Sequence, residues 1–135
     1  MATRVKSEAN HEPPVVSRKD SPSFIEGRRS FFDYIDFGTI DPSDGQMRVQ
    51  LIRAKEGMVE PTGWHYHVCE GQFVYAIKGW IELEFAEGMH RIEEGDTIFI
   101  PGGCVHNEIR TSDDMELIEM SVPAKMGTVP CDPPR

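Results

Sequence analysis

Short apolar runs that alternate with polar residues dominate the middle of this chain. Ile81, Leu83 and Phe85 alternate with Glu82 and Glu84, which predicts a strand whose glutamates face solvent. No pattern of helical period exceeds two turns. Besides the segment around residues 65–67, strands are expected over residues 30–35, 47–54, 72–77, 80–85, 89–92, 97–100, 106–110 and 115–122. Short strands separated by frequent turns predict an all-β sandwich or barrel.

The two ends of the chain have a different composition from the middle. Residues 1–22 and 123–135 are rich in proline and show neither strand nor helix periodicity. We therefore expect a flexible arm over residues 1–22, one barrel domain over residues 23–122 and a Pro-rich tail over residues 123–135. Such arms are either disordered or wrap a neighbouring subunit.

Composition narrows the classes of partner. The chain has 135 residues, of which 39% are hydrophobic and 27% charged, as is usual for one globular domain. A net charge of -9 disfavours nucleic acid and anionic membranes, which both attract basic surfaces. The sequence has no secretory signal and no run of the roughly 20 apolar residues that span a bilayer. A cytoplasmic location is the expectation.

Three of the five histidines lie in two motifs that suggest a metal site. His65 and His67 are two positions apart in a strand pattern, so their side chains share one face. His106 follows the turn Pro101-Gly102-Gly103, in which glycine allows a close backbone approach. Imidazole is a common ligand of transition metals, so three convergent histidines predict a metal site.

The spacing of these residues resembles the two motifs of the cupin family. In the first motif four residues separate His65-Tyr66-His67 from Gln72, and six more lead to Gly79. In the second, five residues separate Gly95 from Pro101-Gly102-Gly103, and His106 follows after two more. The resemblance implies a jelly-roll barrel, the double-stranded β-helix, that pairs as a homodimer. It also implies that His65, His67 and His106 bind a metal in the barrel mouth.

The sequence departs from the cupin pattern at the fourth ligand, which is usually a glutamate. Gln72 occupies that position and can coordinate through its amide oxygen, but it adds no charge. Four neutral ligands would leave a divalent ion its full charge, which favours an anionic substrate and weakens retention of the metal. Glu70 is the alternative fourth ligand, and a site without metal is a further alternative. The metal is a divalent transition metal, with iron, zinc, manganese and nickel left open.

Other residues are candidates for the pocket wall. Val74 and Ala76 share strand parity with Gln72 and predict an apolar wall, to which Phe99, Met47 and Leu51 could add. Glu108 lies two residues beyond His106 and is either an acid or base near the metal or a solvated strand position. Cys69 and Cys104 lie inside the two motifs, close to the metal or simply buried. His11 and His90 lie outside the motifs and are not expected to be ligands.

Two functions remain open at this point. An enzyme would act on a small organic molecule: ferrous iron favours dioxygenase chemistry, whereas zinc, nickel or manganese favours isomerase, lyase or hydrolytic chemistry. No separate catalytic base can be identified from the sequence. The alternative is a binding or sensing module that holds a small ligand without turnover, and the fold does not decide between these functions.

Overall fold

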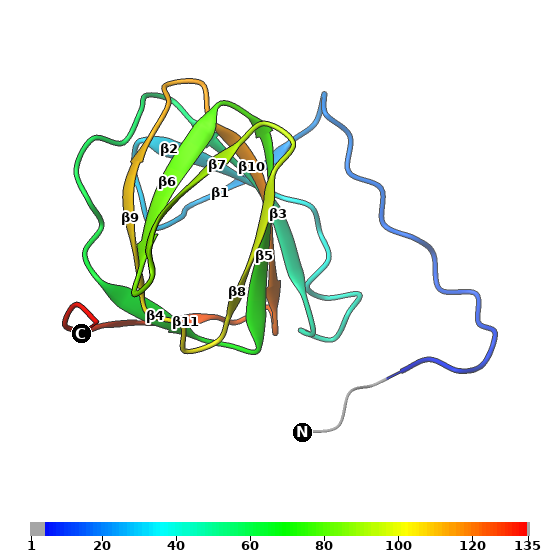
Figure 1. Ribbon diagram of the computed structural model, residues 1–135. Helices are drawn as coiled ribbons and strands as arrows, with labels where there is room; N and C mark the ends of the chain where they lie inside the picture. The colour runs from blue at the N-terminus through cyan, green and yellow to red at the C-terminus, as the bar shows by residue number, and fades with distance from the viewer. Residues whose placement is uncertain (1–4, 135) are drawn as a thin grey trace.

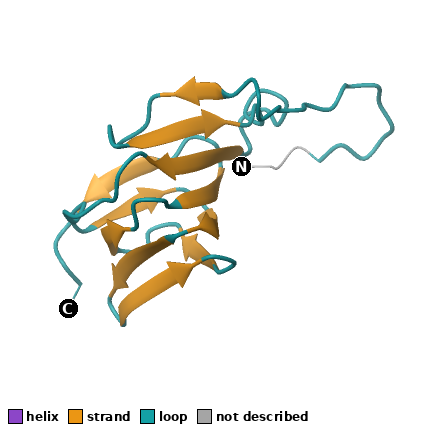
Figure 2. Cartoon of the chain, turned by 90° about the horizontal axis from the view of Figure 1, so that it is seen from above, coloured by secondary structure: helices purple, strands orange, loops and turns teal. Residues whose placement is uncertain are grey.

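The computed structural model describes residues 5–134, which form strands, turns and loops only (Figure 1, Figure 2). The predicted all-β architecture is confirmed. Within these residues no helix has the length and apolar character needed to cross a membrane. The strands are β1 (Ser23–Ile25), β2 (Phe32–Asp36), β3 (Arg48–Ala54), β4 (His65–Val68), β5 (Gly71–Lys78), β6 (Trp80–Phe85), β7 (Gly88–Glu93), β8 (Thr97–Pro101), β9 (His106–Thr111), β10 (Glu116–Val122) and β11 (Gly127–Pro130).

The strands form two antiparallel sheets that face each other across the interior. One sheet has the order β1-β2-β3-β10-β5-β8, and the other has the order β11-β4-β9-β6-β7. Strand β10 pairs with both β3 and β5, so the last long strand of the sequence lies in the middle of the first sheet. Figure 1 shows the two sheets enclosing the interior of the barrel. This arrangement places β4 and β9 opposite β3, β5 and β10.

Apolar side chains fill one part of the barrel interior. They come from both sheets, which is the expected origin of the core in two packed sheets. The members of this core are Phe32, Tyr34, Ile52, Met58, Val74, Ala76, Ile81, Leu83, Phe85, Ile92, Ile100, Met115 and Leu117. The predicted inward faces of β5 and β6 are therefore confirmed. The candidate site lies where this core meets the buried polar residues of the interior.

Two strands were not predicted from the sequence. β1 pairs with β2, and β11 pairs with β4 over the register from Gly127↔Val68 to Pro130↔His65. Both strands are short and proline-flanked, so their sequences carry little periodicity. Residues 127–130 thus extend a sheet beyond residue 122, where the sequence placed the end of the barrel. The flexible arm over residues 1–22 stays a prediction, and its described part, residues 5–22, contains no strand.

The prediction that Glu82 faces solvent is wrong. Glu82 is only 8% exposed, although it alternates with the core residues of β6. Arg110 donates to its carboxylate at 2.5 Å, and Arg91 lies 3.7 Å away while also stacking over the ring of Trp80. The two arginines cover the carboxylate and compensate its charge, so an acidic residue can be buried on the outer face of this sheet.

The prediction that Met47, Leu51 and Phe99 add to the pocket wall is also wrong. None of them lines the cavity, and Phe99 is 61% exposed. The opposite face of β3 points inward instead, with Gln50 buried and Arg48 at the cavity. The polar face turns inward because Glu119 of β10, which also bonds to Gln72 of β5, accepts a hydrogen bond from Gln50 and pairs with Arg48.

Candidate metal centre

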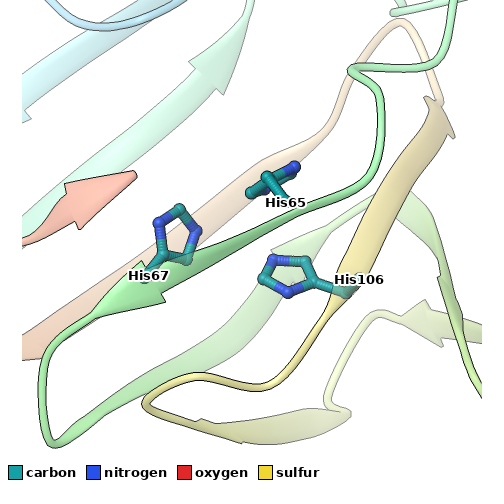
Figure 3. A group of neighbouring side chains, drawn as sticks. All are labelled: His65, His67 and His106. Atoms are coloured by element: carbon teal, nitrogen blue, oxygen red, sulfur yellow. The ribbon is translucent and has the colours of Figure 1, made fainter. Parts of the chain in front are cut away.

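Strand pairing brings the three predicted histidines together. His65 and His67 lie on β4, and His106 on β9 is the direct register partner of His65. All three are nearly inaccessible, with 3%, 4% and 1% of their surfaces exposed. One ligand nitrogen from each ring lies within 4.8 Å of the others, and Figure 3 shows the three rings gathered around a common point. Three imidazoles in this arrangement could hold a metal ion.

The turn Pro101-Gly102-Gly103 locks β9 against β4. Gly102 donates its N–H to the carbonyl of Glu70 at 3.1 Å, and Gly103 donates to the carbonyl of His67 at 2.9 Å. A Cβ at Gly102 would overlap the carbonyl oxygen of Cys69, so only glycine permits this approach. The turn therefore fixes the distance between the strand that carries two histidines and the strand that carries the third.

Each histidine is oriented through its Nδ1 atom. Nδ1 of His65 lies 2.7 Å from the carbonyl of Gly63, and Nδ1 of His106 lies 2.9 Å from the carbonyl of Cys104. A carbonyl only accepts, so both rings carry their proton on Nδ1 and keep the lone pair of Nε2. Such a second contact commonly orients metal-binding histidines and raises their basicity. Nε2 of His65 is buried without a hydrogen-bond partner, so its lone pair is free to bind a metal ion.

Thr128 orients the third histidine and was missed by the sequence prediction. Its Oγ1 lies 3.0 Å from Nδ1 of His67. Thr128 is on β11, whose pairing with β4 places Thr128 opposite His67. The only signal in the sequence is the β-branched pair Thr128-Val129 within the proline-rich tail, which is too short to predict a strand.

Gln72 is held by a buried polar network at the inner face of the first sheet. Its Nε2 donates to Glu119 at 2.5 Å, and Gln50 donates to the same carboxylate at 2.8 Å. Arg48 lies 3.5 Å from it. An ionised carboxylate only accepts, so the amide must turn its nitrogen toward Glu119. The Oε1 atom of Gln72 then faces away, buried and without a hydrogen-bond partner.

Burial and the neighbouring charges favour the neutral form of His67 and His106. Burial, followed by the neighbouring His106 and His65, lowers the pKa of His67 to about 4. Burial also lowers the pKa of His106. Glu108 Oε2 lies 3.4 Å from His65 Nε2. Burial raises the pKa of Glu108, but the approach of His65 and the charges of Arg28 and His106 outweigh it, so this pKa lies below its usual range. Neutral imidazoles beside a carboxylate fit a divalent cation.

A cavity of ≈ 190 Å³ opens beside the histidines. His67, His106, Gln72 and Glu108 line it on the polar side. Its apolar wall is formed by Phe32, Ile52, Val74, Ile81, Leu83, Ile100 and Leu117. A polar cluster at one end of a small apolar cavity is the usual form of a small-molecule site.

Comparison with known families identifies the fold and its motifs. The family model described as "Cupin domain" matches residues 51–122, more than half of the chain. The chain belongs to the cupin family. The resemblance seen in the two histidine motifs is thus confirmed, and so is the small barrel that it implies.

Solved structures similar to this cupin show how widely its fold is used. KdgF from Halomonas sp. is 15% identical, with a TM-score of 0.66, over 82% of this chain and 95% of that one. The nucleoside dehydratase Pac13 is 15% identical, with a TM-score of 0.58, over 80% and 86%. A variant of Pac13 from Streptomyces with one substituted residue, solved with uridine, has the same identity and TM-score. Salicylate 1,2-dioxygenase from Pseudaminobacter salicylatoxidans is 13% identical, with a TM-score of 0.56, over 70% and 27%. A search among curated proteins gave no match. These low identities establish the shared fold.

Other candidates from the sequence lie outside the histidine cluster of this cupin. Glu70 is exposed in the loop after β4, and it does not line the cavity. Cys69 and Cys104 are half-buried free thiols whose pKa values are raised by burial. His90 is exposed on β7 beside Glu87, and His11 is exposed in the N-terminal segment. Among residues 5–134, the group of acidic, cysteine and histidine side chains suited to a metal contains only His65, His67 and His106.

Proposed function

We propose that this cupin is a metal-dependent enzyme of the dioxygenase type that acts on a small organic molecule. His65, His67 and His106 would hold a divalent transition metal, and Gln72 would add its amide oxygen as the fourth ligand. The observation that carries the proposal is the cluster of three buried imidazoles whose ligand atoms lie within 4.8 Å of one another. Two buried atoms that make no hydrogen bond, His65 Nε2 and Gln72 Oε1, support the same donor set.

The chain's own groups have defined roles in this proposal. A redox-active ion such as iron would supply electrons for reaction with dioxygen, and a metal such as zinc would supply only a Lewis acid. The carbonyls of Gly63 and Cys104 keep two imidazoles in the required tautomer. The apolar wall excludes water from the space next to the histidines. Glu108 lines the cavity 3.4 Å from His65 Nε2 and could receive a proton from a bound substrate.

A binding or sensing protein without turnover is the second candidate. Two of the three carboxylates that line the cavity are already engaged. Glu119 accepts from Gln50 and Gln72, and Glu108 lies against His65. This leaves little free acid–base capacity, which favours binding over proton-transfer chemistry.

Metal analysis of protein purified without chelator tests the proposal first. We expect close to one equivalent of a transition metal, and a content below about 0.1 equivalent would refute the metal-dependent function. His106→Ala should abolish metal binding, whereas the matched variant His90→Ala, at an exposed position of β7, should retain it.

Oxygen consumption then separates the enzyme from the binding protein. Iron-loaded protein should consume oxygen with at least one member of a panel of catechols, diketones and small organic acids. Tight ligand binding with neither oxygen uptake nor product would favour the binding protein. Product formed without oxygen uptake would instead indicate isomerase or lyase chemistry.

The homodimer implied by the cupin resemblance stays a prediction. Phe24, Tyr75 and Phe99 are exposed on strands of the six-stranded sheet and are candidates for a subunit contact. Light scattering at micromolar concentration would detect it, and a monomer there would contradict it. The cytoplasmic location is also a prediction.

A further inference from the structure

A segment before β2 closes one side of the cavity. β1 pairs with β2 through Ser23↔Asp36 to Ile25↔Tyr34, and residues 25–29 then line the cavity. A Cβ at Gly27 would overlap the ring of Tyr34, so the backbone lies directly on that ring. Arg29 donates its backbone N–H to the hydroxyl of Tyr34 at 3.2 Å. The segment is thus held in one place by a buried tyrosine, and Arg28 is held with it.

The side chain of Arg28 lines the cavity without a protein partner. Among residues 5–134 it makes no hydrogen bond and no ion pair. It lines the same cavity as His67 and His106, so it lies beside the histidine site. A guanidinium presents several donors in a planar fork, which suits a carboxylate. Arg28 is solvent-exposed where it lines the cavity, so its unpaired fork is free to meet a ligand that enters.

Three of the other five charged side chains around the cavity are engaged with protein groups. Arg48 lies at Glu119, which also accepts from two glutamines, and Glu108 lies at His65. Three arginines and three glutamates line the cavity, namely Arg28, Arg29, Arg48, Glu26, Glu108 and Glu119. Their charges cancel, so a divalent ion on neutral imidazoles would leave the cavity positive. A positive cavity attracts an anion, although the chain as a whole is acidic.

The apolar wall and the volume limit the size of that anion. Phe32, Ile52 and Val74 lie on the inner faces of the sheet that the Arg28 segment joins. A volume of ≈ 190 Å³ is below the several hundred Å³ of sites for drug-sized ligands. A small inorganic anion would leave this wall unused. A compact organic acid would use both the wall and the arginine.

We propose that the cavity takes a small organic monocarboxylate and that Arg28 binds its carboxylate. The inference rests on the proposed function in placing the substrate beside the histidines, and it adds the substrate class and the group that selects it. Gly27 and Tyr34 are positioning residues, because they hold the segment that presents Arg28.

Calorimetric titration with benzoate and with benzamide, its neutral isostere, tests the proposal. The unsubstituted protein should bind benzoate at least about tenfold more tightly than benzamide. Arg28→Gln should remove about tenfold of benzoate affinity and leave benzamide affinity unchanged, and Arg28→Lys should retain part of the preference. Arg53→Gln is the matched control, because Arg53 lies on β3 beside Asp33 and does not line the cavity.

A second variant tests the role of the segment. Gly27→Ala should displace the segment from Tyr34 and cause the same selective loss of benzoate affinity, with urea unfolding showing that the barrel remains folded. Failure of both benzoate and hexanoate to bind the unsubstituted protein would overturn the proposal. Equal losses of benzoate and benzamide affinity in Arg28→Gln would also overturn it. So would binding of inorganic phosphate to the cavity as tight as that of benzoate.

Repeating the titrations on protein stripped of metal with a chelator separates this inference from the metal-dependent function. The Arg28-dependent preference should persist without metal, because the guanidinium is independent of the histidines. A preference present only with metal and unaffected by Arg28→Gln would overturn the role of Arg28 and leave the metal site intact. The reverse result, a preference that depends on Arg28 in a protein that binds no metal, would refute only the proposed enzyme.

Discussion

Gln72 donates its amide nitrogen to Glu119 at 2.5 Å and leaves its amide oxygen buried without a partner. The cupin pattern would place a glutamate at residue 72. Here the negative charge is carried instead by Glu119, the hydrogen-bond partner of Gln72. Glu119 keeps that charge among Gln50, Gln72 and Arg48. Gln72 therefore keeps a neutral, unpaired oxygen in the interior while the charge remains on Glu119 within the same buried network.

Exchanging these two residues tests the relationship. Gln72→Glu would place two carboxylates in contact, and we expect it to lower the free energy of unfolding by roughly 1–3 kcal/mol. The double variant Gln72→Glu/Glu119→Gln restores one charge and one amide, and it should regain most of that stability. Urea unfolding of the single and double variants, after metal is removed with a chelator, measures the coupling energy between residues 72 and 119.

Metal affinity gives the second readout of the exchange. With the carboxylate moved to the ligand position, the double variant should bind a divalent metal about tenfold more tightly than the unsubstituted protein. Additive effects of the two substitutions on stability would show that the pair is not coupled. Unchanged metal affinity in a stable double variant would show that residue 72 is not a ligand.

The histidine site could be predicted from the sequence because strand geometry is local. Alternation puts His65 and His67 on one face, and the glycine turn before His106 gives the close approach seen at Gly102. Thr128 and Glu119 could not be predicted, because their contacts depend on which strands pair. Residue 128 reaches His67 only through β11, and Glu119 reaches Gln72 only because β10 lies beside β5.

The errors at Glu82 and on β3 have a common physical cause. Hydrophobic alternation identifies a buried face only where that face is apolar. Glu82 is buried beneath Arg91 and Arg110, and the inward face of β3 carries Arg48 and Gln50. In both places the buried polar side chains have hydrogen-bonding or charged partners. Hydrophobic periodicity therefore assigned Glu82 to solvent and turned the wrong face of β3 toward the cavity.

Thr128→Val should weaken metal binding without unfolding the barrel. The substitution keeps the β-branched shape but removes the hydroxyl that lies 3.0 Å from Nδ1 of His67. Loss of such an orienting contact typically costs about tenfold or more in metal affinity. Thr97→Val on the exposed end of β8 is the matched control. Metal titration with a competing chelator measures the effect, and equal affinities of the two variants would contradict the role of Thr128.

Gly102→Ala should damage both stability and the metal site. The added Cβ would overlap the backbone carbonyl of Cys69, so the turn must move away from β4. We expect a loss of about 2 kcal/mol or more in unfolding free energy, together with weaker metal binding, because His106 moves with the turn. Gly127→Ala is the control, since its Cβ would make only ordinary contacts with Val68. If both alanine variants unfold at the same urea concentration, the close approach is not required.

Acid should destabilise the metal-free protein through its buried histidines. The pKa of His67 is lowered from 6.5 to about 4, so between these values the unfolded chain binds a proton that the folded chain does not. Stability is therefore complete above the unfolded pKa and falls as the pH decreases toward about 4, by up to roughly 1.4 kcal/mol per pH unit for one such histidine. The lowered pKa of His106 acts in the same direction. Urea unfolding of chelated protein across this range should show the slope, and His67→Gln should reduce it while His90→Gln serves as the control. A midpoint that does not change over this range would mean that these imidazoles accept protons without opening the barrel.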